Sequence, residues 1–354
     1  MTTPVLELKA KLDRGDIIDG KYKVVKKLGE GGCGSVFRCQ LVRKPEELVA
    51  VKLLESPNDL QRFEREVEVL KTIESPWVVG YRGTGKHLQF PYLAMEYLAG
   101  GSLRDYLESK KVLPVKESAW IVIMAIRGLR DCKTVHRDLK PENILVSKAA
   151  SNRIEFLIDN PKKGSVVKLA DFGLAKSFDV KRTRLTMTGQ IMGTPLYMSP
   201  EQCQNTHKVT PQSDIYALGI LLYEMVTGDT PFNANDPYTL LKMHNEDDVK
   251  YPRSMDQQIQ AVIRRCLQKK PEKRYANLTD LEHDLAIIAG VKKPKGGTKS
   301  PATGGLSEGA RWLLILVGMT LFIALSWMLR ERVLSVFNDW WNPAPAKVAK
   351  PTRP

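Results

Sequence analysis

The sequence predicts an α+β protein made of a β-rich lobe, an α-rich lobe and one C-terminal transmembrane helix. Three patterns lead to this prediction: short β-type runs in the first third, apolar residues at helical spacing in the middle, and a long uncharged apolar run near the end. At 354 residues, of which 43% are hydrophobic, the chain is long enough for one large or two-lobed globular unit with additional segments.

The β-rich lobe is predicted over about residues 17–98, after an N-terminal segment of residues 1–16. Its predicted elements are one helix over DLQRFEREVEVLKTIE (59–74) and strands over 22–28, 35–41, 48–54 and 92–97. Charged residues interrupt the N-terminal segment every few positions, which argues against a signal peptide. We therefore expect the front of the chain to stay in the cytoplasm.

The α-rich lobe is predicted over about residues 99–290. Apolar residues recur there at helical spacing over 117–132, 214–228 and 257–268, and each of these stretches predicts a helix. We find no internal repeat, so a single packed lobe is expected and not a solenoid.

The C-terminal part is predicted to attach the chain to a membrane. A basic linker rich in Gly, Pro and Lys (291–311) leads to 18 uncharged, apolar residues (312–329), and a short Pro-rich tail follows (330–354). A buried core helix or an amphipathic surface helix is the alternative. The run, however, has no polar stripe, and the linker separates it from any core.

The charges around this run predict its orientation. Four lysines precede it, namely Lys292, Lys293, Lys295 and Lys299. Because positive residues collect on the cytoplasmic side, we expect a single-pass protein of the cell inner membrane with its globular part in the cytoplasm. Thr320 and Ala324, two small residues four positions apart, permit a homodimer.

Composition narrows the function classes. The net charge is +14, and residues 291–354 contribute +7 of it with ten Lys or Arg against three Asp or Glu. This tail lacks the interleaved aromatic residues that stack on bases, so we expect no nucleic-acid partner. The five cysteines include no C-x-x-C pair, which favours a reducing compartment over a disulfide framework or a zinc site.

A glycine-rich stretch, LGEGGCGSV (Leu28–Val36), lies between two predicted strands. Because glycine has no Cβ, such a hairpin can bring backbone N–H groups close to a phosphate, although many glycine-rich hairpins are simple turns. Farther along, the predicted strand VAVK ends on Lys52, whose amine could pair with phosphate oxygens.

Two later motifs, VHRDLKPENIL (135–145) and LADFGLA (169–175), each place an Asp between apolar flanks. Together with the glycine-rich stretch and VAVK, in this order, they resemble the eukaryotic-type protein kinase family over about residues 17–290. The motif HRDLKPEN resembles the Ser/Thr class, and the single apolar run resembles that of bacterial membrane-anchored kinases. The resemblance implies the bilobal protein kinase fold and transfer of the ATP γ-phosphate to Ser or Thr hydroxyls of protein substrates.

The resemblance also implies roles for individual residues. Asp138 would accept or orient the proton of the substrate hydroxyl, Lys140 would neutralise the γ-phosphate, and Asn143 and Asp171 would hold Mg²⁺ or Mn²⁺. Lys52 would contact the α and β phosphates and pair with a helix carboxylate, for which Glu66 is preferred over Glu64. ATP-binding positions would be Leu28, Gly29, Gly31, Gly34, Val36, Ala50, Lys52, Met95, Glu96 and Leu98.

Other positions would support the site. By resemblance, Asp214 braces the catalytic loop and Glu201 pairs with Arg274. Arg137 would belong to a basic pocket that binds a phosphothreonine, with autophosphorylation expected at one or more of Thr183, Thr186 and Thr188.

Two departures leave alternatives open. Asn143 and Asp171 are 28 positions apart, about twice the expected spacing, so residues 147–165 form an insertion with a predicted strand over RIEFLID and a turn at NPKKG. This insertion is either a docking surface or a loop without function. The segment between the helix predicted over 117–132 and the HRD motif is about two residues shorter than expected, so a pseudokinase scaffold that binds partners without phosphate transfer is the alternative function. A third alternative, a protein that binds anionic lipid or nucleic acid, is supported only by the basic tail.

Overall fold

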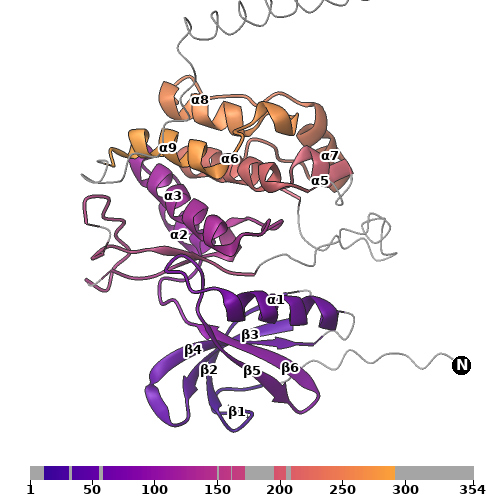
Figure 1. Cartoon of the computed structure of the whole chain (residues 1–354), viewed down its shortest axis with the longest axis vertical. Coiled ribbons are helices and arrows are strands. Elements are labelled where there is room, and N and C mark those ends of the chain that lie inside the picture. Colours follow the sequence, from indigo (N-terminus) through magenta and orange to yellow (C-terminus); the bar gives the residue numbers. More distant parts are fainter. Residues whose placement is uncertain are drawn as a thin grey trace, which may run out of the picture. The chain divides into compact units, whose positions relative to one another are not determined.

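The computed structural model describes residues 12–31, 34–55, 59–149, 151–160, 162–171, 195–204 and 209–291. These residues lie in one compact unit, Met1–Lys292. Figure 1 shows a sheet with one long helix in the first third of the chain and a group of helices in the rest. The prediction of a β-rich lobe followed by an α-rich lobe is therefore confirmed.

The first lobe is built on a six-stranded antiparallel sheet with the strand order β1-β2-β3-β4-β6-β5. All four predicted strands are present with shifted ends, and β1 and β5 were not predicted. The strands are β1 (Ile17–Ile18), β2 (Tyr22–Gly31), β3 (Gly34–Leu41), β4 (Lys44–Leu54), β5 (Tyr81–His87) and β6 (Phe90–Glu96).

The glycine-rich stretch forms the hairpin between β2 and β3. Gly31 pairs with Gly34 across this hairpin. Gly34 has a φ of +144°, and a Cβ at this position would lie 1.9 Å from the carbonyl oxygen of Leu53. Only glycine fits there, because any side chain would push the hairpin away from β4.

Within the described residues of this lobe, the one α-helix is α1 (Leu60–Thr72), close to its predicted range. Phe63, Val67 and Leu70 are buried along one face at helical spacing. Glu66 is buried on the same face, so packing of the apolar residues also turns its carboxylate towards the protein interior.

The second lobe is mostly helical. Its longest helices, α3 and α6, are buried along most of their length, as expected for helices that are apolar on nearly every side. The helices are α2 (Leu103–Lys110), α3 (Val115–Cys132), α5 (Pro200–Gln204), α6 (Pro211–Thr227), α7 (Pro237–Glu246), α8 (Gln257–Cys266) and α9 (Leu278–Ala289), with short 3-10 helices η2 (Pro141–Asn143) and η4 (Pro271–Lys273). A small hairpin, β7 (Ile144–Val146) and β8 (Val167–Leu169), completes the lobe.

Backbone contacts join the two lobes at β8. Leu169 N–H donates to the carbonyl of Trp77 over 2.8 Å and its own carbonyl accepts from Val79 N–H over 3.0 Å. Gly128 of α3 permits this approach, because a Cβ there would lie 2.7 Å from the Trp77 carbonyl oxygen. The segment after α1 thus fixes β8 and the residues that follow it.

The insertion differs in part from its prediction. Within its described residues the stretch RIEFLID forms no strand, although Ile154, Phe156 and Ile158 pack against the core as their alternation indicates. Ser165 satisfies the backbone of Glu155 in place of a neighbouring strand. Its N–H donates to Glu155 O over 2.6 Å, and its hydroxyl accepts from Glu155 N–H over 2.9 Å. The predicted turn forms where Gly164 N–H donates to Asn160 O.

Several predictions fall outside the described residues. These are the span over 312–329, the tail over 330–354, the linker beyond Val291, the pair Thr320 and Ala324, and the threonines Thr183, Thr186 and Thr188. In the part of the chain that is described, none of the helices has the length and apolar character needed to cross a bilayer.

Candidate active site

Three charged side chains from separate elements meet beside the sheet. Lys52 lies on β4, between Val36 of β3 and Leu93 of β6 in the ladder. Its Nζ is 3.0 Å from Glu66 Oε2 and 2.6 Å from Asp171 Oδ1. Of the two glutamates weighed from the sequence, Glu66 makes this contact, whereas Glu64 is exposed.

The lysine sets the electrostatics of this group. Burial alone would lower the pKa of Lys52, but the Asp171 and Glu66 carboxylates raise it well above its ordinary value. Burial raises the pKa of Glu66, and Lys52 offsets only part of that rise. Burial would raise the pKa of Asp171 as well, but Lys52 holds it below its ordinary range. A permanent cation therefore lies against an ionised Asp171.

The loop after α3 brings Asp138, Lys140 and Asn143 together. The Asn143 side-chain amide donates to the Asp138 carbonyl over 2.8 Å and to Asp138 Oδ2 over 3.0 Å. Lys140 Nζ is 3.4 Å from the same carboxylate oxygen. Ala170 N–H donates to Asn143 O over 2.9 Å, so the β7–β8 hairpin places Asn143 beside Asp171.

Asp214, in the first turn of α6, holds the backbone of this loop in place. Its two carboxylate oxygens accept the backbone N–H groups of His136 and Arg137 over 2.8 and 3.0 Å. Burial raises the pKa of Asp214 to about 7, against the lowering effect of these two hydrogen bonds. Arg137 has a φ of +67°, and Gln202 of α5 donates to its carbonyl over 2.9 Å. The loop is thus held in a sparsely populated conformation by side chains from two helices.

The end of β6 lies where the sequence predicts the connector to the adenine. Met95 pairs with Ala50 of β4, and both side chains are buried. The Glu96 carboxylate accepts from Gly80 N–H over 3.0 Å and from Lys168 Nζ of β8 over 2.8 Å. Leu98 follows the strand, and among the described residues its N–H has no hydrogen-bond partner.

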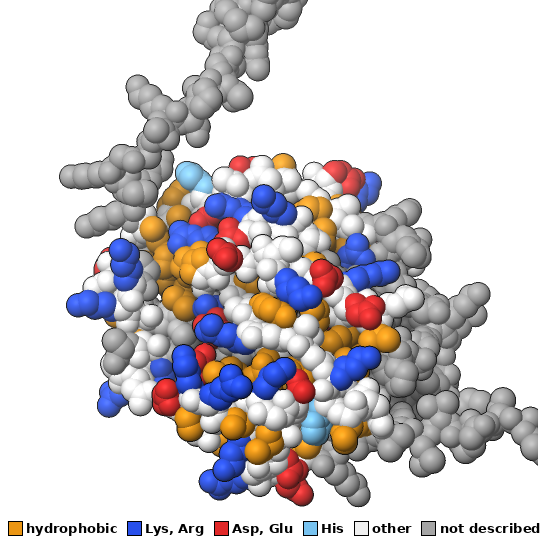
Figure 2. Space-filling model, turned by 60° about the horizontal axis from the view of Figure 1, so that its bottom comes forward, with side chains coloured by type: hydrophobic (Ala, Val, Ile, Leu, Met, Phe, Trp, Pro, Cys, Tyr) orange, Lys and Arg blue, Asp and Glu red, His pale blue; other side chains and the backbone are white. Residues whose placement is uncertain are grey.

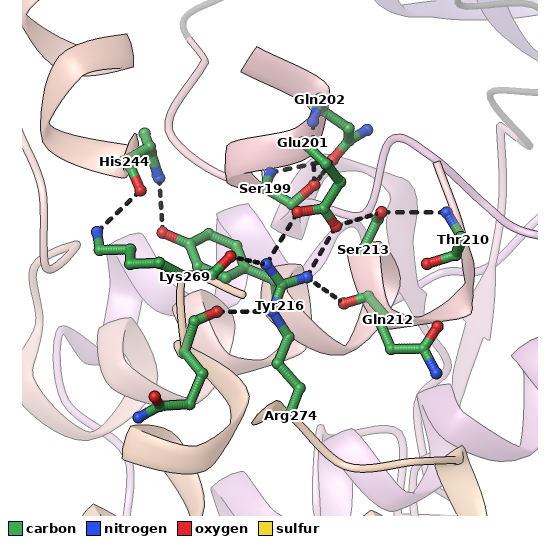
Figure 3. Close-up of polar contacts among 11 residues, drawn as sticks. Ser199, Glu201, Gln202, Thr210, Gln212, Ser213, Tyr216, His244, Lys269 and Arg274 are labelled. Atoms are coloured by element: carbon green, nitrogen blue, oxygen red, sulfur yellow. Dashed lines mark hydrogen bonds and ion pairs between the residues drawn. The ribbon is translucent and has the colours of Figure 1, made fainter. Parts of the chain in front are cut away.

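Glu201 of α5 and Arg274 form a buried, bidentate ion pair, shown in Figure 3. The two side chains are 9% and 0% exposed. The other donors of the guanidinium bond to the carbonyls of Gln212, Gln268 and Lys269, so all five N–H groups are satisfied. Ser213 of α6 also donates to Glu201 Oε1 over 2.6 Å. The pair joins α5 to α6 and to the segment around η4.

The remaining predicted ATP-binding residues line β2 and β3. Leu28 and Gly29 lie on β2 and Val36 on β3, with Gly29 opposite Val36 in the register. Leu28 is exposed, whereas Val36 packs against the core that Ala50, Met95 and Leu98 share with the second lobe.

Comparison with known sequences assigns the family. Residues 22–285 match the protein kinase domain, three quarters of the chain. The chain belongs to the protein kinase family. The kinase domain so matched contains every residue of the site described above.

Three bacterial relatives are similar to this kinase. They are a probable serine/threonine-protein kinase of Clostridium perfringens, CPE1738 (33% identical, over 77% of this chain and 39% of the relative), the serine/threonine-protein kinase PrkC of Bacillus subtilis (30%, over 77% and 41%), and the serine/threonine-protein kinase PknB of Mycobacterium leprae (31%, over 83% and 45%). The chain spans less than half the length of each of these curated relatives.

Some residues around the site were not singled out from the sequence. Lys168 donates to Glu96, and Gln202 donates to the carbonyl of Arg137. Arg104, Tyr197 and Glu224 contact one another. Their contacts join residues from 27 to 120 positions apart, which no local pattern reveals.

Proposed function

We propose that this kinase transfers the γ-phosphate of ATP to serine and threonine hydroxyls of protein substrates. One observation carries the proposal: Lys52, Glu66 and Asp171 form a single charged group, and the β7–β8 hairpin ties it to Asn143 and Asp138. Phosphoryl transfer requires positioning and charge neutralisation more than covalent chemistry, and these groups supply both. The names of the bacterial relatives support the Ser/Thr class.

The residues fit ATP as substrate. The glycine hairpin of β2 and β3 is held close against β4 by Gly34, and the amine of Lys52 lies on the neighbouring strand to meet phosphate oxygens. In the part of the chain that is described, the N–H of Leu98, three positions after the buried Met95, has no hydrogen-bond partner, and it is placed to donate to an adenine ring.

The residues also fit a divalent cation such as Mg²⁺ or Mn²⁺. Asn143 uses its amide nitrogen on Asp138, so its amide oxygen is the atom that would meet a cation, and the Asp171 carboxylate, which Lys52 contacts through Oδ1, would supply a second oxygen. Two hard oxygen donors with phosphate oxygens suit these ions. The cation would offset negative charge on the phosphates.

In the proposed reaction Asp138 accepts the proton of the substrate hydroxyl as the oxygen attacks the γ-phosphorus, the bond from this phosphorus to the bridging oxygen of the β-phosphate breaks, and ADP leaves. Asn143 orients the Asp138 carboxylate through its 3.0 Å hydrogen bond, and Lys140, 3.4 Å from the same carboxylate, is placed to neutralise the transferring group. Asp214 contributes by holding the backbone of the loop.

The test is transfer of labelled γ-phosphate to protein substrate by the full chain, with Asp138→Asn as the inactive variant. We expect this substitution to lower kcat by at least about 10²-fold, because general-base catalysis contributes that much, while ATP affinity is retained. Asp229→Asn, at an exposed position after α6, is the matched control. Equal incorporation by the unchanged chain and Asp138→Asn, or none by either with ATP still bound, would favour the pseudokinase scaffold.

The proposal includes two features of the whole protein. We propose autophosphorylation at Thr183, Thr186 or Thr188, supported by Arg137 next to Asp138, and phosphopeptide mapping of active protein tests it. We also propose that residues 312–329 anchor the kinase in the cell inner membrane with residues 17–290 in the cytoplasm, supported by hydropathy and flanking charge.

A further inference from the structure

Lys168 of β8 forms an ion pair with Glu96, the last residue of β6 and the first of the connector (residues 96–100). Its Nζ is 2.8 Å from Glu96 Oε2, and the two side chains are 16% and 27% exposed. The same carboxylate oxygen accepts from Gly80 N–H over 3.0 Å, and the N–H of Glu96 donates to Gly80 O over 2.8 Å. The ion pair therefore joins the connector to a strand of the second lobe.

The strand β8 is held in place independently of this ion pair. Leu169, the residue after Lys168, bonds the backbone of Trp77 and Val79, and all three residues of β8 pair with β7. Loss of the Lys168 ammonium would therefore release the Glu96 carboxylate, while β8 keeps its position.

The β7–β8 hairpin holds both ends of the connector. At the first end, Lys168 of β8 donates to the Glu96 carboxylate. At the other end, Gly100 N–H donates to Val146 O of β7 over 3.0 Å. Leu98, whose N–H is proposed to meet the adenine ring, lies between these two points.

The same hairpin leads to the groups proposed to meet the phosphates and the cation. Asp171 follows Lys168 by three positions, and its Oδ1 is 2.6 Å from Lys52 Nζ. Asn143 directly precedes β7. One hairpin therefore connects the adenine side of the site to its phosphate side.

We infer that Lys168 is a positioning residue for the nucleotide: through Glu96 it sets the place of the connector, and hence of the adenine ring, relative to Asp171. The inference rests on the proposed function, because it requires ATP to lie between the connector and Asp171. Since Lys168 acts on nucleotide binding, its loss should weaken binding and leave the transfer step nearly unchanged.

Steady-state kinetics of the full chain separate binding from transfer. Lys168→Met removes the ammonium, and we expect KM for ATP to rise about tenfold, the factor that a charge-assisted hydrogen bond is worth, while kcat stays within about twofold. Lys168→Arg keeps a cation and should hold KM within about threefold of the unchanged chain. Lys71→Met removes an exposed pair with Glu68 on α1 and, as the matched control, should change neither constant.

Calorimetric binding of adenosine without metal isolates the connector, because adenosine carries no phosphate. Lys168→Met should weaken adenosine and MgATP by the same factor of about ten. Asp171→Asn should weaken MgATP and leave the affinity for adenosine unchanged. An adenosine affinity that is the same with and without Lys168 would overturn the inference, and so would a fall in kcat as large as the fall in kcat/KM.

Glu96→Gln tests whether Lys168 acts through this carboxylate. Alone it should weaken adenosine about tenfold, and combined with Lys168→Met it should add little to the loss from either change. A product of the two losses, about a hundredfold, would refute the route through Glu96. Lys168→Gln, a neutral donor, should lie between the Met and Arg variants, and it provides the same comparison if Lys168→Met does not fold.

Adenosine binding does not depend on catalysis, so the two proposals fail separately. A chain that shows these shifts in adenosine affinity but transfers no phosphate would refute the proposed reaction and leave the role of Lys168 intact. A chain that transfers phosphate and binds adenosine equally well without Lys168 would refute the role of Lys168 alone.

Discussion

His244 of α7 is a fully buried imidazole that stays neutral in the folded kinase. Figure 3 shows its contacts with Tyr216, whose hydroxyl is 3.0 Å from Nδ1, and with Lys269, whose Nζ donates to the His244 carbonyl over 2.8 Å. The imidazole ring also meets the Phe232 ring edge-on. Burial, with a smaller effect of the nearby Lys269 charge, lowers the pKa of His244 to about 3 from 6.5.

This shift predicts acid sensitivity. Below pH 6.5 the unfolded chain binds a proton at His244 that the folded chain does not, so stability is full above pH 6.5 and is lost as pH falls towards 3. Between pH 6.5 and 5 the loss is about 2 kcal/mol in the free energy of unfolding. Urea unfolding at both pH values measures it.

The variant His244→Asn should lose about 2 kcal/mol less than the unchanged chain over this interval, because Asn does not titrate. The amide can still accept from Tyr216, so the fold is retained at neutral pH. His283→Asn, on the exposed side of α9, is the matched control and should keep the pH dependence. An unchanged slope in His244→Asn would contradict the assignment.

For single residues, the sequence singled out side chains that the structure brings together, and it predicted the contacts of Lys52 with Glu66 and of Glu201 with Arg274. VAVK, HRDLKPEN and LADFG identified Lys52, Asp138, Asn143 and Asp171 because those motifs are local and ordered. The direct contact of Lys52 with Asp171 joins residues 119 positions apart, and only the folded chain reveals it. The contacts of Arg104 with Glu224 and Tyr197 likewise join distant positions and were not predicted.

Among the elements, α5 depends on the buried pair of Glu201 and Arg274. Arg274→Met would leave the Glu201 carboxylate in the interior with the Ser213 hydroxyl as its one side-chain donor from the described residues. We expect a loss of about 3–5 kcal/mol in the free energy of unfolding, measured by urea titration. Phosphate transfer should fall together with stability, because α5 also holds the Arg137 carbonyl through Gln202.

Arg130→Met is the control at this scale. Arg130 is 46% exposed and pairs with Glu282, so its loss should cost less than about 1 kcal/mol. Similar losses for the two variants would mean that burial does not govern the energetics of these pairs.

The elements that the sequence missed have physical explanations. β5 (YRGTGKH) contains two glycines and few β-branched residues, so it forms because β6 pairs with it and not from its own propensity. Conversely, RIEFLID alternates as a strand does, but its apolar residues pack on the core while Ser165 satisfies the backbone of Glu155. In both cases tertiary contacts outweighed the local pattern.

The distribution of positive charge over the whole molecule indicates where it could meet an anionic membrane surface. On the face drawn in Figure 2, Lys and Arg side chains lie among acidic and hydrophobic ones and do not form one uninterrupted basic field. Half of the net charge of +14 belongs to residues 291–354 instead. The basic segment therefore lies next to the apolar run, which is the arrangement expected near an anionic membrane surface.

That arrangement leads to a prediction for the intact chain. Residues 312–329 carry no charge, so the full chain should remain with the membrane fraction after alkaline extraction. Two arginines at the centre, Leu321→Arg with Leu325→Arg, should release it, since each costs about 2.5–3.5 kcal/mol on insertion. Leu321→Phe with Leu325→Phe keeps the run apolar and should stay in the pellet.

The same preparations test whether anchoring and catalysis are separate. The described kinase residues end at Val291, the first residue of the linker, so the arginine variant should transfer phosphate in solution at a rate close to that of the detergent-solubilised unchanged chain. Extraction of the unchanged chain into the soluble fraction would refute the anchor, and it would leave the kinase assignment intact, because that assignment depends on residues 22–285 alone.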